Sequence, residues 1–285
     1  MARLFVDNLT VIDFSYLDSE RGIVGESWIV DIELSGELND QGMVFDFGHV
    51  KKQIKYYIDE EIDHCLLVPM VGSGCTSSLD KGELTIEFPL NNGGVISHQS
   101  PSDAVVLVDA ETINTKYIAD DLQLKIKALL PKNVLKVAIK LRPEVINGAY
   151  YHYTHGLQKH LGQCQRIAHG HRSRIEILLN ETRSAKLEAQ WANTLKDCYI
   201  ATESHIVDEY QVDGIAHTQL AYTAQQGNFS ISLPSSYLFT MPKESTVENI
   251  AICLAELIST ECKEAVLVKA FEGLNKGAFA EAVWS

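Results

Sequence analysis

The sequence predicts an α+β fold of two tandem domains, each an antiparallel four-stranded sheet with two helices packed on one face. The chain has 285 residues, 46% hydrophobic and 22% charged, which suits one large or two ordinary globular domains. Strand-like and helix-like patterns occur twice in the same order, and faintly similar segments recur in both halves. We therefore expect domains at residues 1–145 and 146–285.

The repeat is inferred from four pairs of segments that occur in the same order in both halves. The first pair aligns Gly25 with Gly170, an offset of 145 residues from 25 to 170. The other pairs are 49–52 with 194–197, 82–89 with 227–234, and 111–122 with 245–257. A duplicated domain with a junction near residues 143–148 is the economical explanation.

Each half is expected to begin with two strands and a helix. In the first half the strands are 4–14 and 28–35, and Trp28, Val30 and Ile32 alternate along the second. Apolar residues at helical spacing then predict a helix near 50–62.

The remaining elements complete a β-β-α-β-α-β order in each half. In the first half we expect a strand at 84–88, a second amphipathic helix and a last strand at 134–141. In the second half, the stripe from Val247 to Ile258 predicts a helix, and 265–271 predicts the last strand. Residues 71–78 and Gly93–Gly94 are expected in surface loops.

Charge and composition exclude several classes of protein. A net charge of −14 disfavours a duplex nucleic acid partner. No window approaches the ~18 consecutive apolar residues of a membrane span. The N-terminal run contains acids and no small-residue cleavage site, so we expect a strand and not a signal peptide. The six cysteines form no CxxC, so we expect free thiols and a cytoplasmic location.

A candidate metal site lies in residues 151–177. His169 and His171 are two apart at the start of an expected strand, so they project to the same face. His155 follows an aromatic strand that can lie beside it. Three histidines with an open fourth position are typical of a catalytic zinc site. Cys164 lies between them and could be a fourth ligand of a structural zinc, or a reactive thiolate.

The order of these groups resembles the 6-pyruvoyl-tetrahydropterin synthase family, which includes the 6-carboxytetrahydropterin synthases of queuosine biosynthesis. The resemblance continues with the DFG at 46–48, the Asp63–His64 pair, the T-x-E-N at 246–249 and a glutamate, Glu272, near the C-terminus. A member of that family is about half as long as this chain, so the resemblance covers both halves.

The resemblance implies the tunnelling fold and a role for each matched residue. Zn²⁺ would be held by His155, His169 and His171. The implied catalytic groups are Cys164, Asp63 and His64, and the implied pterin-binding groups are Glu272 and Thr246. The implied substrate is 7,8-dihydroneopterin triphosphate. A homo-oligomer is also implied, because neighbours close the sheet edges of this fold; three chains would mimic six single domains.

The two halves differ in which of these groups they retain. At the repeat offset, Val24 and Glu26 stand where His169 and His171 stand, and, with a change in loop length, Ser204–His205 is taken to match Asp63–His64. The losses are complementary, and in the family the zinc and the Asp-His pair come from different subunits. We therefore predict one composite site for each pair of halves, within one chain or across chains.

The product of such a site stays open at this point. We expect 6-carboxytetrahydropterin, and triphosphate elimination to 6-pyruvoyl-tetrahydropterin is the alternative. Two alternative functions do not involve catalysis. One is a pterin- or purine-binding protein with structural zinc, and the other is a zinc-stabilised assembly protein in which Cys164 is a ligand. Retention of Asp63–His64 favours the enzyme, because a degenerate binder has no use for an acid/base pair.

Overall fold

The computed structural model describes residues 2–38, 40, 42–44 and 47–284. Asp46 of the DFG segment lies outside the described residues. The elements of the first half are β1 (Ala2–Asp18), β2 (Gly22–Gly36), α1 (Phe47–Glu61), β3 (Leu66–Pro69), β4 (Thr76–Asp80), β5 (Glu83–Pro89), β6 (Val95–Pro101), β7 (Val105–Val108), α2 (Thr115–Leu129) and β8 (Val134–Pro143).

The second half repeats this order with additional short strands. Its elements are β9 (Tyr150–His155), β10 (His169–Leu179), β11 (Thr182–Arg183), α3 (Ala185–Thr194), β12 (Cys198–Thr202), β13 (Ile206–Val212), β14 (Ile215–Ala224), β15 (Gly227–Pro234), β16 (Leu238–Met241), α4 (Val247–Cys262), β17 (Val266–Phe271) and β18 (Gly277–Ala282).

The sheets are larger than the expected four-stranded antiparallel ones. The first half has a five-stranded sheet, β7-β3-β1-β2-β8, and the second a seven-stranded one, β16-β12-β9-β10-β17-β18 with β11 beside β10. In both, the added strands β3, β7, β12 and β16 pair in parallel. The prediction was wrong here because β3 is four residues long and buried throughout, so it shows no alternation.

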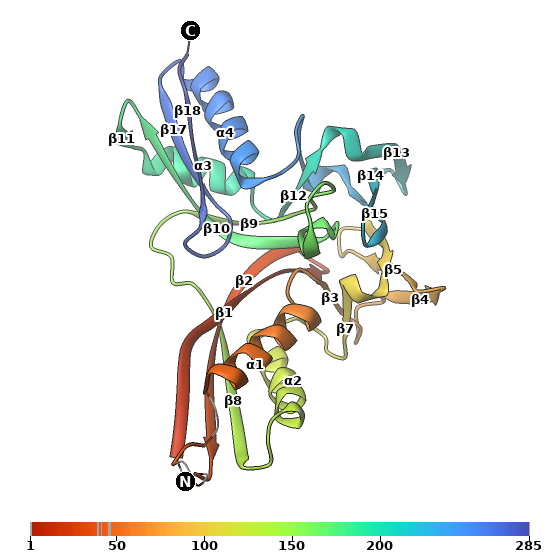
Figure 1. Cartoon of the computed structure of the whole chain (residues 1–285). Helices are drawn as coiled ribbons and strands as arrows, with labels where there is room; N and C mark the ends of the chain where they lie inside the picture. Colours follow the sequence, from red (N-terminus) through yellow and green to blue (C-terminus); the bar gives the residue numbers. More distant parts are fainter. Residues whose placement is uncertain (1, 39, 41, 45–46, 285) are drawn as a thin grey trace.

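A third sheet joins the halves. Its order is β13-β14-β15-β6-β5-β4, so three strands come from each half (Figure 1). β15 pairs antiparallel with β6, and Ile231 lies opposite His98 at the centre of the pairing. β4 also takes in part of the expected loop 71–78. Backbone hydrogen bonds therefore run across the boundary between the repeats.

Two helices cover one face of each large sheet, as the amphipathic patterns predicted. α1 and α2 pack on β1, β2 and β8, and α3 and α4 pack on β9, β10 and β17 (Figure 1). α4 begins at a capping residue, because the Thr246 hydroxyl accepts the Asn249 N–H at 3.3 Å. No helix in the described part of the chain is long and apolar enough to cross a membrane.

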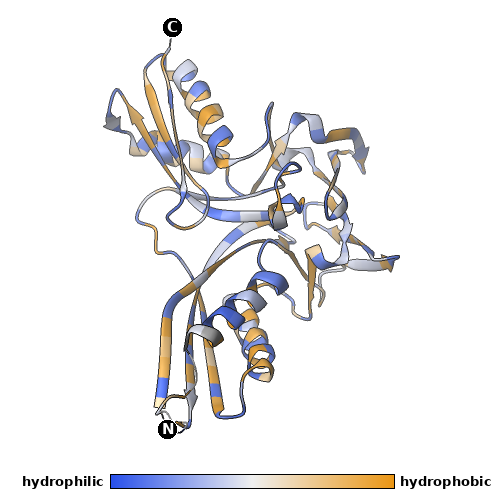
Figure 2. Ribbon diagram, in the orientation of Figure 1, coloured by the Kyte–Doolittle hydropathy of each residue, from blue (hydrophilic) through white to orange (hydrophobic). Residues whose placement is uncertain are grey.

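The halves meet where β2 and β10 cross, about an approximate two-fold axis. Ser15 Oγ and Thr154 Oγ1 lie 2.8 Å apart at this axis, one from β1 and one from β9. A Cβ on Gly25 would lie 1.8 Å from the Tyr153 oxygen, so the strands approach as closely as their backbones allow. Figure 2 shows pale and blue ribbon at this crossing and more orange on the strands and helices away from it.

The strand pairing corrects the predicted repeat alignment after the first two strands. Leu66 pairs with Ser15, and Tyr199 pairs with Thr154, so Leu66 and Tyr199 are counterparts. The counterpart of His64 is therefore Asp197, and both have positive φ angles, 57° and 54°. The predicted equivalence with Ser204–His205 is wrong, because the offset is 139 residues in β1 and β9, 145 in β2 and β10, and 133 beyond the first helix.

Candidate active site

The three histidines singled out in the sequence form one buried cluster. His155 ends β9 and lies opposite His169 at the start of β10, and His171 is two residues farther along the same strand. Their side chains are at most 1% exposed. One ligand atom from each lies within 4.8 Å of the others. The structure therefore brings together all three predicted metal ligands on one face of one sheet.

The ring nitrogens of this histidine cluster suit a divalent metal. Nδ1 of His155 donates to the Ser245 oxygen at 2.8 Å, and Nδ1 of His169 donates to the Arg166 oxygen at 2.9 Å. A carbonyl only accepts, so the Nε2 atom of each ring is left with a lone pair. Nε2 of His155 and both nitrogens of His171 are buried without a hydrogen-bond partner in the described structure. Buried nitrogen lone pairs that lie close together and have no other partner are suited to Zn²⁺.

Burial also keeps two of these rings, those of His155 and His169, neutral. Desolvation, together with the neighbouring His171, lowers the pKa of His155 to about 3. Burial and the adjacent histidines likewise lower the pKa of His169 well below its ordinary value. A neutral imidazole is the form that binds a metal, so this environment prepares the ligands at neutral pH.

Cys164 lies beside the histidine cluster on a short 3₁₀ helix, Gly162–Gln165. Sγ of Cys164 and ring nitrogens of His64 and His169 lie within 4.8 Å of one another. The rings of His64 and His169 are 5.0 Å apart, centre to centre. His64 belongs to the first half, whereas Cys164 and His169 belong to the second, so groups about a hundred residues apart in sequence meet within one chain.

His64 is held and polarised by the residue before it. Its Nδ1 lies 2.8 Å from Oδ2 of Asp63, and the two side chains are 15% and 17% exposed. Burial alone would lower the pKa of His64, but hydrogen bonds to Asp63 and Cys164 raise it to about 10. A protonated His64 therefore places a positive charge beside the sulfur of Cys164.

The two predicted substrate-binding residues lie near different histidines of the cluster. Glu272 directly follows β17, and its Oε1 is 3.9 Å from Nε2 of His171. The expected last strand is followed by β18, so Glu272 lies at a hairpin and not at the end of the sheet. Thr246 caps α4, next to Ser245, whose oxygen holds His155. Both are partly exposed.

Asp13 and Lys276 also line the site and were not singled out in the sequence. Asp13 of β1 is 5% exposed, and its Oδ1 lies 3.3 Å from Nδ1 of His171. Lys276 Nζ lies 3.4 Å from Oδ2 of Asp13 and 3.6 Å from Oε2 of Glu272. An acid inside the apolar run VIDFSYL was the available signal for Asp13, because a buried strand rarely carries an unpaired charge.

The symmetric position on the first half has no metal-binding histidines. Tyr16, Val24 and Glu26 occupy it, and the Arg21 guanidinium donates to Asp197 and to the Tyr16 hydroxyl at 2.9 Å. No group of three metal-ligating side chains is found there among the described residues. Arg21 supplies a fixed positive charge at this position, where the sequence predicts that the first half lacks zinc ligands.

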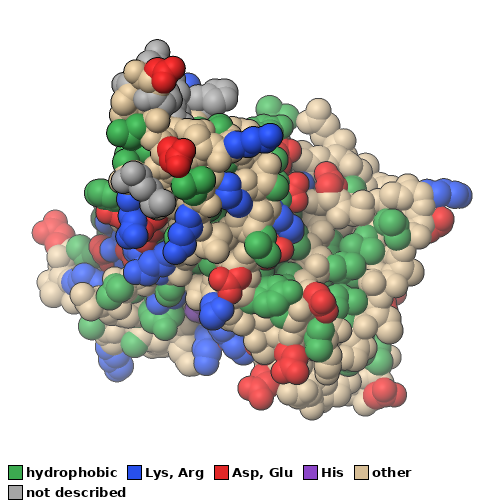
Figure 3. Space-filling model, turned by 90° about the horizontal axis from the view of Figure 1, so that it is seen from below, with side chains coloured by type: hydrophobic (Ala, Val, Ile, Leu, Met, Phe, Trp, Pro, Cys, Tyr) green, Lys and Arg blue, Asp and Glu red, His purple; other side chains and the backbone are tan. Residues whose placement is uncertain are grey.

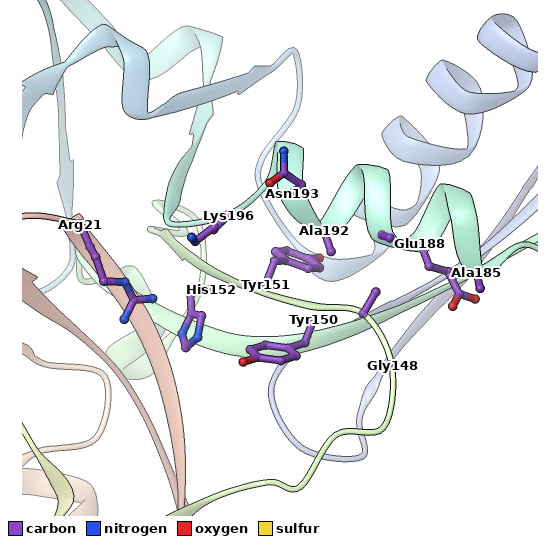
Figure 4. Close-up of a pocket in the computed structure, with 12 residues that line it drawn as sticks. Arg21, Gly148, Tyr150, Tyr151, His152, Ala185, Glu188, Ala192, Asn193 and Lys196 are labelled. Carbon is purple, nitrogen blue, oxygen red and sulfur yellow. The ribbon is translucent and has the colours of Figure 1, made fainter.

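An open cavity of about 750 Å³ lies next to this metal-free position. Figure 4 shows Arg21, His152 and Lys196 at one end of it, with Tyr150 and Tyr151 between them and the small side chains of α3. It is separate from the histidine cluster. On the face in Figure 3, acidic and basic side chains are interspersed, and almost no histidine reaches the surface.

Comparison with known proteins decides the family. The family model described as 6-pyruvoyl tetrahydropterin synthase matches the chain twice, at residues 13–128 and 144–282. The chain belongs to this family. The two matches also show that the chain is a tandem duplication, as the repeat predicted. Each half of this tetrahydropterin synthase homologue thus corresponds to one copy of the family's domain.

Individual relatives have low sequence identity to this chain. A protein of Pyrococcus horikoshii, provisionally named 6-carboxy-5,6,7,8-tetrahydropterin synthase, is 27% identical over 135 residues, which cover 47% of this chain and 77% of that protein. A protein of the same name from Pyrococcus abyssi is 26% identical over 135 residues, with the same coverage.

Solved structures are also similar to half of the chain. The 6-pyruvoyltetrahydropterin synthase of Plasmodium vivax, as an E37A catalytic residue mutant, is 18% identical with a TM-score of 0.36, covering 50% of this chain and 97% of that one. The Plasmodium falciparum enzyme is 15% identical with a TM-score of 0.37 over the same shares.

Proposed function

We propose that the chain is a zinc-dependent synthase that converts 7,8-dihydroneopterin triphosphate to 6-carboxytetrahydropterin at one composite site per chain. One observation carries the proposal. His64, paired with Asp63 in the first half, lies against Cys164 and the histidine cluster of the second half. Acid/base pair, thiol and metal ligands are thus assembled without a second copy of the chain. The names of the Pyrococcus relatives support the carboxy product.

The metal would be held by His155, His169 and His171. Zn²⁺ bound there would polarise the hydroxyls of the substrate side chain and stabilise negative charge that develops on them. Proton transfer and binding of the pterin ring would be carried out by side chains of the protein. The three residues that would hold the metal lie on paired strands, β9 and β10, so the strand register sets their relative positions.

Proton transfer is assigned to Cys164 and His64. As a thiolate, Cys164 takes a proton from the substrate side chain, and the adjacent His64 imidazolium stabilises that thiolate. His64 then passes protons to and from the hydroxyls. Asp63 fixes the orientation of the ring, because Nδ1–H donates to the carboxylate 2.8 Å away and Nε2 is left to face the reaction.

Binding of the pterin ring is assigned to Glu272 and Thr246. The Glu272 carboxylate can accept two parallel hydrogen bonds from the amidine-like edge of the ring. Burial would raise its pKa, but His171 and Lys276 lower it, so Glu272 is ionised and able to accept. The Thr246 hydroxyl accepts one N–H as a cap and still has its own proton to donate.

The test is a reaction with product identification by mass. The zinc-loaded protein is incubated with 7,8-dihydroneopterin triphosphate, and a chelator-treated sample serves as the control. We expect 6-carboxytetrahydropterin from the zinc-loaded sample alone. The mass of 6-pyruvoyl-tetrahydropterin would support the alternative reaction instead. Zinc bound in stoichiometric amount without turnover would support a pterin-binding protein and contradict the enzyme.

A further inference from the structure

We propose that Asp13 is a positioning residue through which the first half orients the metal ligand His171 and keeps it in register with the Asp63–His64 pair. The inference rests on the proposed function, because it concerns residues placed toward the same metal. It gives the first half a second contribution to the site, besides the acid/base pair. It also explains why a buried carboxylate lies in the middle of β1.

The three metal ligands are oriented by different means. Nδ1 of His155 and Nδ1 of His169 each donate to a backbone carbonyl of the second half. Nδ1 of His171 instead lies 3.3 Å from Oδ1 of Asp13, in a charged contact, and it makes no hydrogen bond within the described structure. His171 is therefore the ligand whose orientation depends on a side chain, and that side chain belongs to the other half.

Asp13 is itself held from three directions. The Ser27 hydroxyl donates to Oδ1, and Lys276 Nζ lies 3.4 Å from Oδ2. A Cβ on Gly273 would lie 2.6 Å from Oδ1, so the β17–β18 turn closes over the carboxylate. A buried carboxylate costs free energy unless it is fully paired. With these partners its direction is fixed, and it points at His171.

The backbone of Asp13 fixes the acid/base pair. Its N–H donates to Oδ1 of Asp63 at 2.8 Å, and its carbonyl accepts the His64 N–H at 2.7 Å. The side chain of one residue thus reaches the metal ligand, while its main chain sets the place of Asp63 and His64. The distance between the metal ligand and the Asp63–His64 pair is then set by β1, and not by the packing between two independent domains.

A carboxylate behind a metal-bound imidazole has a known physical effect. It fixes the tautomer and the ring orientation and makes the distal nitrogen a stronger donor. Loss of such a partner weakens metal binding by about 10- to 100-fold. We expect the substitution Asp13→Asn to have this effect, because the amide keeps the size and the Ser27 bond but loses the charge.

The approximate two-fold axis supplies a matched control. His152 stands on β9 where Asp13 stands on β1, two residues before Thr154 and Ser15 respectively. It faces the metal-free side, where its Nδ1 donates to the Gly25 oxygen at 2.7 Å. His152→Asn perturbs an equivalent position at the junction of the halves without touching the histidine cluster.

The experiment measures zinc affinity by competition with a chromophoric chelator, for the wild type, Asp13→Asn and His152→Asn. We expect the Kd for zinc to rise about 10- to 100-fold in Asp13→Asn and to stay within about twofold in His152→Asn. Thermal unfolding of the metal-free proteins controls for folding. A zinc Kd unchanged in Asp13→Asn, with or without a lower metal-free Tm, would overturn the inference.

Activity separates this inference from the proposed function. If the wild-type protein binds zinc but does not turn over the substrate, the proposed function is contradicted. The comparison of zinc Kd values between the wild type and the variants remains valid in that case. With turnover, we expect kcat to fall more than KM rises in Asp13→Asn, because the substrate contacts assigned to Glu272 and Thr246 are retained. Asp13→Glu restores the charge, and partial recovery of zinc affinity is expected from it.

Discussion

Gly25 of β2 and Gly170 of β10 lie in direct backbone contact: a Cβ on Gly170 would lie 2.6 Å from the Cα of Gly25. The same Cβ would lie 2.3 Å from the Tyr153 oxygen and 2.7 Å from the Ser15 hydroxyl. These two glycines defined the repeat in the sequence. In the structure they allow the strand with the metal ligands to rest on the half that supplies His64.

Substitution at this contact tests how far the site depends on the crossing of β2 and β10. Gly170→Ala forces the crossing strands apart, since backbone atoms of β9 and β2 cannot yield as a flexible side chain can. We expect a loss of about 1–3 kcal/mol in the free energy of unfolding, measured by urea denaturation. We also expect weaker zinc binding, because His169 and His171 flank the position. Unchanged stability would contradict the close packing.

The sequence predicted the elements with strong periodicity and missed those without it. The amphipathic patterns located α1, α2 and α4, and alternation located β2. The four-residue strand β3 is uniformly buried and so carries no period. The six-stranded sheet shared by the halves could not be predicted, because pairing between β6 and β15 depends on how two domains dock. Propensity and periodicity describe one segment at a time.

The site was predicted where its residues are close in sequence or matched a known pattern. The histidine cluster follows from strand alternation, which is local. The sequence predicted that His64 and Cys164 meet, but it left open whether they meet within one chain or between two chains. Asp13 was missed because its significance depends on His171, 158 positions further along the chain. Single residues that act across a domain junction leave almost no local signal.

Removal of the imidazole at position 64 tests the acid/base role. We expect His64→Ala to lower kcat by about 10²- to 10⁴-fold, the range that a general acid/base contributes, with the zinc content unchanged. His205→Ala is the matched control, because His205 is also buried, but its ring nitrogen contacts Gln158 and Glu244 and not Cys164 or a predicted metal ligand. Full activity in His64→Ala would remove His64 from the proposed mechanism.

The role of Cys164 is tested by metal analysis. If Cys164 is the catalytic thiol, Cys164→Ala keeps one zinc per chain and loses turnover. If it is a fourth ligand of a structural zinc, the same variant loses zinc affinity and stability together. We expect the first result, because the histidine cluster provides three buried ligands without it. Zinc content measured by elemental analysis alongside activity distinguishes the two.

Glu26 predicts a pH dependence of stability on the metal-free side. Burial raises its pKa from 4.5 to about 7, although the Ser27 backbone N–H and Arg172 lower it. The folded state therefore binds the proton more tightly than the unfolded state. The resulting stability is fully present below pH 4.5 and is lost as the pH rises toward about 7.

Glu26→Gln removes this titration and is the test. Above pH 7 we expect the variant to be more stable than the wild type by about 1–3 kcal/mol, because the buried charge is gone. Below pH 5 the two should converge. Urea denaturation at several pH values between 4.5 and 8 measures the difference. A difference that does not change with pH would show that folding does not raise the pKa of Glu26 and would contradict the prediction.

The central claim is that both sides of the active site lie on one chain, and mixing two inactive variants tests it most directly. His64→Ala and Cys164→Ala are co-expressed with different tags, and assemblies that contain both chains are isolated and assayed with 7,8-dihydroneopterin triphosphate. Each chain then lacks one group of its own site, so we predict no recovery of activity above the separate variants. Recovery of a substantial fraction of wild-type turnover would show that His64 and Cys164 meet between chains, and would contradict the account.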